Sequence, residues 1–223
     1  MPSGHHGMME KIPVVILISG LGSNMCALAD RAKEGALPIE IRAVISDRAH
    51  APGLERARER GIHTGTLSAQ DFPTRDAFDA KLAELVDGYA PKLVVLAGYM
   101  KILSTTFVRR FKGRLLNIHP SLLPKYPGLH THRRALEAGD KEHGASVHFV
   151  TDELDSGPIV IQGRMPVRAD DTERSLAARV HEVEHKIYPQ AVEWFARGRV
   201  TMSEDKAWLD GQPLDAPVCL SFE

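Results

Sequence analysis

Apolar residues gather in short runs along this chain, and helical repeats separate the runs. Residues 14–18 and 93–97 contain no charged residue and are rich in Val, Ile and Leu. Such runs are typical of strands that are buried on both faces of a parallel sheet. The sequence predicts further strands over residues 41–45, 62–67, 114–119, 146–150 and 159–162.

Between these strands, apolar residues recur every three or four positions, which is the spacing of an amphipathic helix. The predicted helices cover residues 25–34, 52–60, 74–86, 131–138 and 171–188, and we expect the last to stop or kink at Pro189 and to resume as far as Gly198. Repeated strand–helix units predict an α/β fold with a doubly wound, mostly parallel sheet and helices on both faces. Ligands of such sheets bind outside the carboxyl ends of the strands.

The length of 223 residues fits one domain, which we place at residues 13–209. Residues 1–12 are polar and are expected to form a flexible N-terminal extension. Residues 210–223 carry few periodic apolar positions and are expected to form a tail, with Trp208 and Leu209 docked on the core.

The charge and the cysteine content limit the kinds of molecule that this protein is expected to bind and the compartment in which it is expected to work. With a net charge of −1, the chain has no electrostatic footprint for nucleic acid or for a membrane surface. Its two cysteines, Cys26 and Cys219, are far apart and suit plain thiols in a reducing compartment. We therefore expect a cytoplasmic protein that binds small molecules, as a monomer or a weak homodimer.

The chain is organised around residues 114–128. Asn117 and His119 are two positions apart in a predicted strand, so both side chains leave the same face. Prolines 120, 124 and 127 then fix a stiff, irregular loop. This arrangement predicts two polar groups held still beside a cleft.

A glycine loop follows the first predicted strand and precedes a helix. In this geometry, backbone N–H groups and the positive end of a helix can meet an anion. The full G-x-G-x-x-G fingerprint of a dinucleotide site is absent, so Gly22, Ser23 and Asn24 fit a single phosphate better. A glycine turn needed only for tight packing remains the alternative.

Asp155 lies in a turn that is dense in carboxylates, and it completes a candidate trio with Asn117 and His119. A carboxylate favours the imidazolium form of a histidine and orients its ring, while an amide N–H can donate to an oxygen that gains charge. The trio suits acyl-type transfer through a tetrahedral intermediate without a covalent enzyme adduct, because nothing around Ser121 forms a nucleophile elbow. A solvated turn acid is the alternative for Asp155.

Residues 181–185 match the H-E-x-x-H pattern of zinc peptidases, through His181, Glu182 and His185, with Glu204 as a possible third ligand. Pro189 would break this helix, and the glycine loop would have no role in such an enzyme. Two histidines on the surface of a helix are the simpler explanation. A nucleotide sensor without catalysis is a third option.

The order of motifs resembles that of the folate-dependent formyltransferases over about residues 13–209. The matching residues are Gly20-x-Gly22-Ser23-Asn24, then Asn117-Ile118-His119-Pro120-Ser121-Leu122-Leu123-Pro124-x-Tyr126-x-Gly128, then Gly144-x-Ser146-Val147-His148-Phe149-Val150 and Leu154-Asp155-x-Gly157. This resemblance implies transfer of a formyl group from 10-formyltetrahydrofolate to the amine of glycinamide ribonucleotide, in purine synthesis and without a metal. It also implies a phosphate-binding half, 13–112, and a catalytic and folate-binding half, 113–209.

The resemblance assigns a role to each site residue. His119 acts in proton transfer, Asn117 holds the formyl oxygen, and Asp155 keeps His119 cationic. The ribonucleotide residues are Gly22, Ser23, Asn24, Gly98, Pro120 and Glu184, and the folate residues are Arg75, Leu96, Met100, Lys101, Ile102, Leu103, Val108, Asn117 and Val150.

Two departures from the family and one related activity need mention. Lys101 stands where an arginine is expected, and Leu21 stands in the glycine loop where a polar residue is common. Formyltetrahydrofolate deformylase is the nearest alternative, because water in place of the amine needs the same trio. We expect the deformylase to carry an extra N-terminal domain and methionyl-tRNA formyltransferase a tRNA-contacting one, and the length of this chain fits neither.

Overall fold

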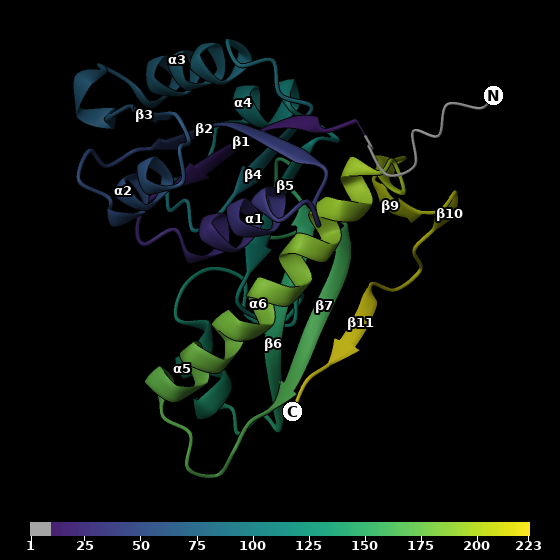
Figure 1. The fold of residues 1–223 in the computed structure, drawn as a ribbon. Helices are drawn as coiled ribbons and strands as arrows, with labels where there is room; N and C mark the ends of the chain where they lie inside the picture. The colour runs from purple at the N-terminus through teal and green to yellow at the C-terminus, as the bar shows by residue number, and fades with distance from the viewer. Residues whose placement is uncertain (1–9) are drawn as a thin grey trace, which may run out of the picture.

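An eight-stranded sheet runs through the computed structural model, which describes residues 10–223 (Figure 1). Its strands are β1 (Ile12–Ile18), β2 (Ile39–Ser46), β3 (Thr64–Thr66), β4 (Leu93–Leu96), β5 (Leu115–His119), β6 (Glu142–Phe149), β7 (Ile159–Pro166) and β11 (Val218–Ser221). Their order across the sheet is β11-β7-β6-β5-β4-β1-β2-β3. All neighbours are parallel except β6, which is antiparallel to both β5 and β7. The predicted mostly parallel, doubly wound sheet is confirmed.

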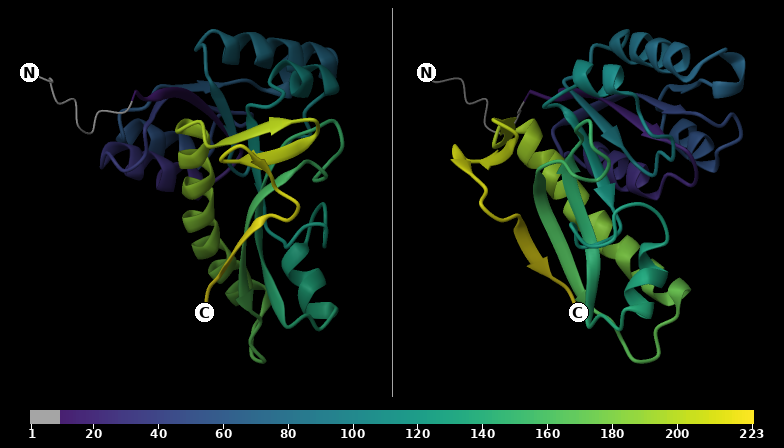
Figure 2. Two further views of the ribbon diagram at one scale, coloured as in Figure 1. Left: turned by 90° about the vertical axis from the view of Figure 1, so that its right-hand side faces the viewer. Right: turned by 180° about the vertical axis from the view of Figure 1, so that it is seen from behind.

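Helices cover both faces of this sheet, as predicted (Figures 1 and 2). They are α1 (Ser23–Lys33), α2 (Pro52–Glu59), α3 (Arg75–Asp87), α4 (Thr105–Arg110), α5 (Thr131–Glu137) and α6 (Glu173–Ala196), with a short 3-10 turn at Ala69–Asp71. The alternation of side chains along β1 divides the core. Val14 and Ile16 belong to the cluster that holds α1 and α6, whereas Val15 and Leu17 belong to the cluster that holds Phe78 of α3.

The last part of the chain differs from the expected tail. A separate sheet of β8 (Val200–Ser203), β9 (Lys206–Leu209) and β10 (Gln212–Pro213) lies beyond the C-terminal end of α6 (Figure 2). After β10 the chain runs back to the main sheet. There β11 pairs with β7 and forms the edge strand. Strand β11 depends on its pairing with β7. Its four residues carry too little periodic signal to be predicted as a strand from the sequence. The predicted extension of residues 1–12 lies largely outside the described residues, and β1 already starts at Ile12.

Helix α6 passes through Pro189 and continues to Ala196, so of the predicted stop or kink at this residue the stop does not occur. A proline lacks the N–H that would donate to the carbonyl four residues earlier, here that of His185. The guanidinium of Arg31 on α1 donates to this carbonyl at 3.2 Å instead. A side chain from a neighbouring helix thus replaces the missing backbone donor.

Candidate active site

A cavity of about 780 Å³ opens at the carboxyl ends of β1, β4 and β5. It brings together the residues predicted from distant parts of the sequence. Those that line it are Gly22, Ser23, Asn24, Leu96, Gly98, Met100, Lys101, Ile102, Leu103, Val108, Asn117, His119, Pro120, Val150, Asp155 and Glu184. Arg75 is the exception, because it lines an adjoining hollow of about 500 Å³ instead.

Strand β5 carries the first two members of the trio. Asn117 and His119 point to the same side because side chains alternate along a strand, and both reach the cavity. The antiparallel neighbour β6 places His148 opposite Asn117 and Ser146 opposite His119. The predicted geometry of this pair is present.

Buried polar side chains hold the loop that follows β5. The Ser146 hydroxyl donates to the Ser121 carbonyl at 2.7 Å and accepts the Leu123 N–H at 3.1 Å. The Gln162 amide donates to the Leu123 carbonyl at 2.7 Å. Ser121 itself is fully buried, and its hydroxyl donates to the Lys125 carbonyl. Ser121 therefore shapes the loop, and its position does not suit a nucleophile.

Each nitrogen of the His119 ring has a distinct neighbour. Its Nε2–H donates to the Tyr126 carbonyl at 2.7 Å, so this nitrogen keeps its proton in either charge state. Its Nδ1 lies 3.5 Å from Asp155 Oδ2, and both side chains are only 7% exposed. Nδ1 is therefore the nitrogen that can exchange a proton in the cavity, beside the Asp155 carboxylate.

The turn of residues 151–157 brings Asp155 back over β5. Asp155 takes a left-handed backbone conformation, with φ 51°, and its carboxylate accepts the Gly128 N–H at 2.8 Å. Gly157 lets the turn close, because a Cβ there would lie 1.7 Å from the Phe149 carbonyl oxygen. The turn places its acid in the cavity, and the solvated alternative does not hold.

His148 is a site residue to which the sequence assigned no role. Burial lowers the pKa of its imidazole, so the ring is neutral at pH 7. Its Nδ1–H donates to the Phe149 carbonyl at 3.0 Å, which leaves Nε2 as an acceptor. The Asn117 Nδ2 lies 3.5 Å from this Nε2, so the nitrogen side of the Asn117 amide faces His148. Only the pairing of β6 with β5 reveals this contact.

The glycine loop ends at Gly22, where α1 begins. Gly22 has a φ of 71°, and a Cβ there would meet the Gly53 Cα at 3.1 Å. Close packing therefore requires glycine here, and a role in packing accompanies any role in binding. The first turn of α1 contains no acidic residue that would compete with an anion for its free N–H groups.

Asn24 and Glu184 form a buried polar pair beside this helix end. The Asn24 Nδ2 donates to Glu184 Oε1 at 3.0 Å, and burial raises the pKa of the Glu184 carboxyl. Asn24 Oδ1 and Glu184 Oε2 are both buried without a hydrogen-bond partner. Buried acceptors of this kind require donors, so a ligand with hydroxyl groups would satisfy them.

The opposite side of the cavity is apolar. Leu96, Val108 and Val150 form its floor, and Met100 and Ile102 stand at its rim with 58% of their surface exposed. Leu154 of the Asp155 turn is similarly exposed at the rim. Such a concentration of exposed apolar side chains marks a ligand site.

Comparison with known proteins decides the family. The model of the formyl transferase family matches residues 12–192. The chain belongs to the formyl transferase family. It is 59% identical to phosphoribosylglycinamide formyltransferase of Escherichia coli, over 90% of this chain and 95% of that protein. The structure of a phosphoribosylglycinamide formyltransferase from Coxiella burnetii superposes with a TM-score of 0.91 and 49% identity, covering 95% of this chain and 100% of that one.

The deformylase alternative is less well supported by these comparisons. The structure of formyltetrahydrofolate deformylase from Burkholderia mallei shares 30% identity with this formyl transferase, with a TM-score of 0.82. It covers 89% of this chain but only 70% of that chain. The relatives with high identity over nearly full length are transferases, which favours the formyl transferase activity over the hydrolase.

The H-E-x-x-H residues of this formyl transferase do not gather as a zinc site. On α6, His181 lines the cavity, whereas Glu182 and His185 do not. Within residues 10–223, no three His, Cys, Asp or Glu side chains are placed to hold a metal ion together. His181 is instead a cavity residue that the sequence missed, although its spacing of three from Glu184 could have indicated it.

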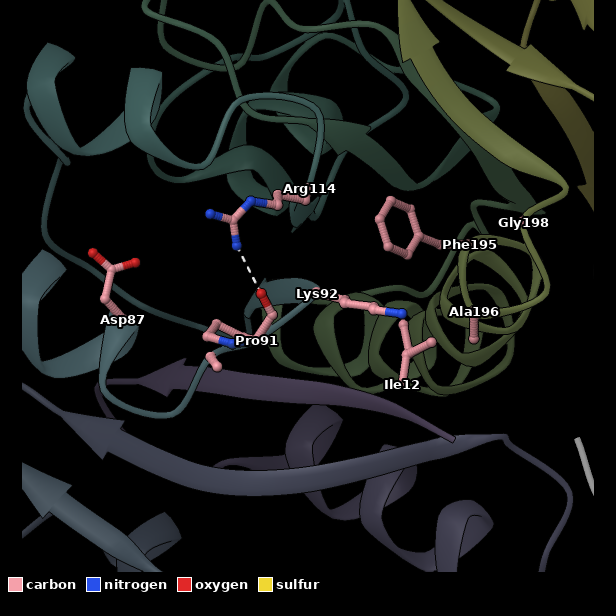
Figure 3. A pocket seen from close by; sticks show the side chains of 9 residues that line it. Ile12, Asp87, Pro91, Lys92, Arg114, Phe195, Ala196 and Gly198 are labelled. Carbon is pink, nitrogen blue, oxygen red and sulfur yellow. Dashed lines mark hydrogen bonds between the residues drawn. The ribbon is translucent and has the colours of Figure 1, made fainter. Parts of the chain in front are cut away.

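A second hollow, of about 670 Å³, lies at the amino ends of β1, β4 and β5, and Lys92, Arg114 and Phe195 are among the residues that line it (Figure 3). The Arg114 guanidinium donates to the Pro91 carbonyl at 2.7 Å there. None of the predicted site residues lines this hollow. No helix within residues 10–223 is long and apolar enough to cross a membrane.

Proposed function

We propose that this protein is a phosphoribosylglycinamide formyltransferase, which transfers the formyl group of 10-formyltetrahydrofolate to the amine of glycinamide ribonucleotide. One observation carries the proposal. A single cavity joins a helix end with two unpaired buried acceptors, a central His119–Asp155 pair and an apolar wall. These three parts correspond to a phosphorylated ribose, a reacting amine and a folate ring.

The ribonucleotide would bind along the start of α1. Gly22, Ser23 and Asn24 would offer backbone N–H groups to its phosphate, which the helix dipole favours. Its ribose hydroxyls would donate to Glu184 Oε2, the acceptor that has no partner in the protein. The amine end would then pass Gly98 and Pro120 and reach His119.

The folate would lie against the apolar wall of Leu96, Val108 and Val150, with residues 100–103 above it. Its glutamate tail would leave the cavity past Lys101 towards Arg75. Lys101 Nζ lies 5.5 Å from the centre of the Phe78 ring. Because this residue is a lysine, it would offer the tail a point charge and not the two-pronged donor of an arginine. The formyl group would meet the amine between Asn117 and His119.

The proposed reaction needs no covalent enzyme adduct and no metal ion. The amine lone pair attacks the formyl carbon, and the formyl oxygen gains negative charge. The Asn117 amide and the His119 imidazolium donate to this oxygen inside a cavity of low polarity, where such donors are most effective. Collapse restores the C=O bond and breaks the bond from carbon to N10. The His119 Nδ1–H gives its proton to N10, and Asp155 accepts the proton that the amine loses and returns it to Nδ1, so that one proton moves in net from the amine to N10.

The test is to follow loss of 10-formyltetrahydrofolate with and without glycinamide ribonucleotide. Transfer predicts that loss of the donor depends on the ribonucleotide. Loss at the same rate without it would indicate the hydrolase instead. The predictions of a cytoplasmic location and of a monomer or weak homodimer are separate from this test and stay predictions.

A further inference from the structure

The loop of residues 98–104 separates the main cavity from the adjoining hollow. Met100, Lys101 and Ile102 line both spaces. The side chains of Met100 and Ile102 are exposed at the rim, so their own packing does little to fix the loop. Hydrogen bonds from elements behind the loop hold its backbone.

Three contacts hold the backbone of the loop at alternate residues. The Met100 N–H donates to the Ser19 hydroxyl at 2.8 Å. The Ile102 carbonyl accepts the Arg75 guanidinium, and the Ser104 N–H donates to Asp79 at 2.7 Å. The loop is therefore tied at both ends and at its middle.

Two of the three anchors are buried polar side chains at the ends of the loop. Ser19 is 2% exposed, and its hydroxyl also donates to Asp47 at 2.7 Å, which directs its lone pair at Met100. Asp79 is 3% exposed. A carboxylate buried to this degree loses its hydration, so burial of this kind is costly unless specific bonds compensate for it.

Helix α3 carries Asp79, the anchor at the Ser104 end of the loop, together with two neighbours that also contact the loop. Arg75, Phe78 and Asp79 are spaced by three and four residues and therefore share one face of α3. Each of them contacts the loop, through the Ile102 carbonyl, the Lys101 side chain and the Ser104 N–H. Ser104 in turn caps α4, which carries Val108 to the floor of the cavity.

We propose that Ser19 and Asp79 are positioning residues for the formyl donor, acting through the backbone of residues 98–104. This inference rests on the proposed function, because it assumes that the loop faces the folate. Neither side chain lines the main cavity, so both act through Met100, Ile102 and Ser104. The phosphate and ribose contacts proposed at Gly22, Asn24 and Glu184 lie outside residues 98–104, and none of the three anchoring bonds is made to Gly98.

The experiment measures binding of tetrahydrofolate and of glycinamide ribonucleotide by calorimetry, and the KM of each substrate. We expect Asp79→Ala to weaken folate binding by about tenfold, the effect of one lost hydrogen bond to a charged group. Ribonucleotide binding should change by less than twofold. Asp79→Asn retains an oxygen that accepts the Ser104 N–H and should restore most of the affinity. Asp76→Ala removes an exposed acid from the same helix and is the matched control.

Ser19→Ala provides a second test, because this small change keeps the packing and removes the acceptor for the Met100 N–H. It should show the same selective loss of folate binding. If Asp79→Ala does not fold, Ser19→Ala tests the inference by itself. Equal effects on both ligands, or none on either, would overturn the inference while the proposed function stands. A wild-type protein that binds neither ligand would overturn both.

Discussion

The Asp155 carboxylate accepts the backbone N–H of Gly128 at 2.8 Å, and this bond joins the acidic turn to the proline loop. The same oxygen, Oδ2, lies 3.5 Å from His119 Nδ1. The acid is therefore held by the loop that directly follows the histidine in sequence. The His119–Asp155 distance does not depend on a flexible surface turn.

His119→Ala should lower kcat by roughly 10²–10⁴-fold, the usual loss when a general acid–base group is removed. The fold should survive, because the Tyr126 carbonyl still accepts the Ser121 hydroxyl at 3.3 Å when the His119 donor is removed. Steady-state kinetics and circular dichroism check this. Turnover near that of the wild type would remove His119 from the mechanism.

Asp155→Asn should lower kcat and shift the acid limb of the pH–rate profile, because the variant removes a negative charge 3.5 Å from His119 Nδ1. The matched control is Asp152→Asn, in the same turn, where the acid pairs with Arg109 at the surface. The control should leave the profile unchanged. If both variants gave the wild-type profile, Asp155 would be a structural turn residue only.

Asn24→Ala should raise the KM for the ribonucleotide by roughly tenfold or more and leave the KM for the folate nearly unchanged. The variant removes the Asn24 amide that orients Glu184, and hydrogen bonds to charged groups contribute about 1.5–3 kcal/mol. Lys33→Ala, at the exposed far end of α1, is the control. A similar rise in both KM values would contradict the phosphate and ribose assignment.

Two neighbouring histidines, His132 and His143, should make stability depend on pH. Burial lowers the pKa of His143 to about 4 and lowers that of His132, whose Nδ1 lies 3.0 Å from His143 Nε2. The unfolded chain takes up these protons near pH 6.5, before the folded chain does, so the stabilisation is complete above that pH. The free energy of unfolding should therefore fall between pH 6.5 and 4, by about 1–2 kcal/mol for His143.

Urea denaturation at several pH values measures this effect. His143→Gln should flatten the pH dependence in this interval, whereas His50→Gln, at an exposed position, should leave it as in the wild type. An equally steep fall in His143→Gln would mean that other groups cause the acid destabilisation.

The parts of the fold that follow local pattern could be predicted from the sequence. Buried runs such as residues 14–18 and 93–97 became β1 and β4, and the helical repeats became helices on both faces. The elements that depend on distant partners could not. Strand β11 exists because it pairs with β7, and α6 continues through Pro189 because Arg31 supplies a donor from another helix.

The same distinction applies to the site. Asn117 and His119 share a strand, and their common face follows from the alternation of side chains. His148 reaches Asn117 only through the antiparallel pairing of β6 with β5, which no spacing in the sequence encodes. Arg75, which we expect near the glutamate tail, lines the neighbouring hollow and not the main cavity. There its guanidinium donates to the Ile102 carbonyl, a contact that the sequence does not indicate.

The fate of the formyl carbon tests the central claim most directly. The protein would be incubated with donor labelled with ¹³C in the formyl group and with glycinamide ribonucleotide, and the products identified by mass spectrometry. We predict that the label appears on the ribonucleotide amine in an amount equal to the tetrahydrofolate formed. Label found as free formate, with the ribonucleotide unchanged, would contradict the account.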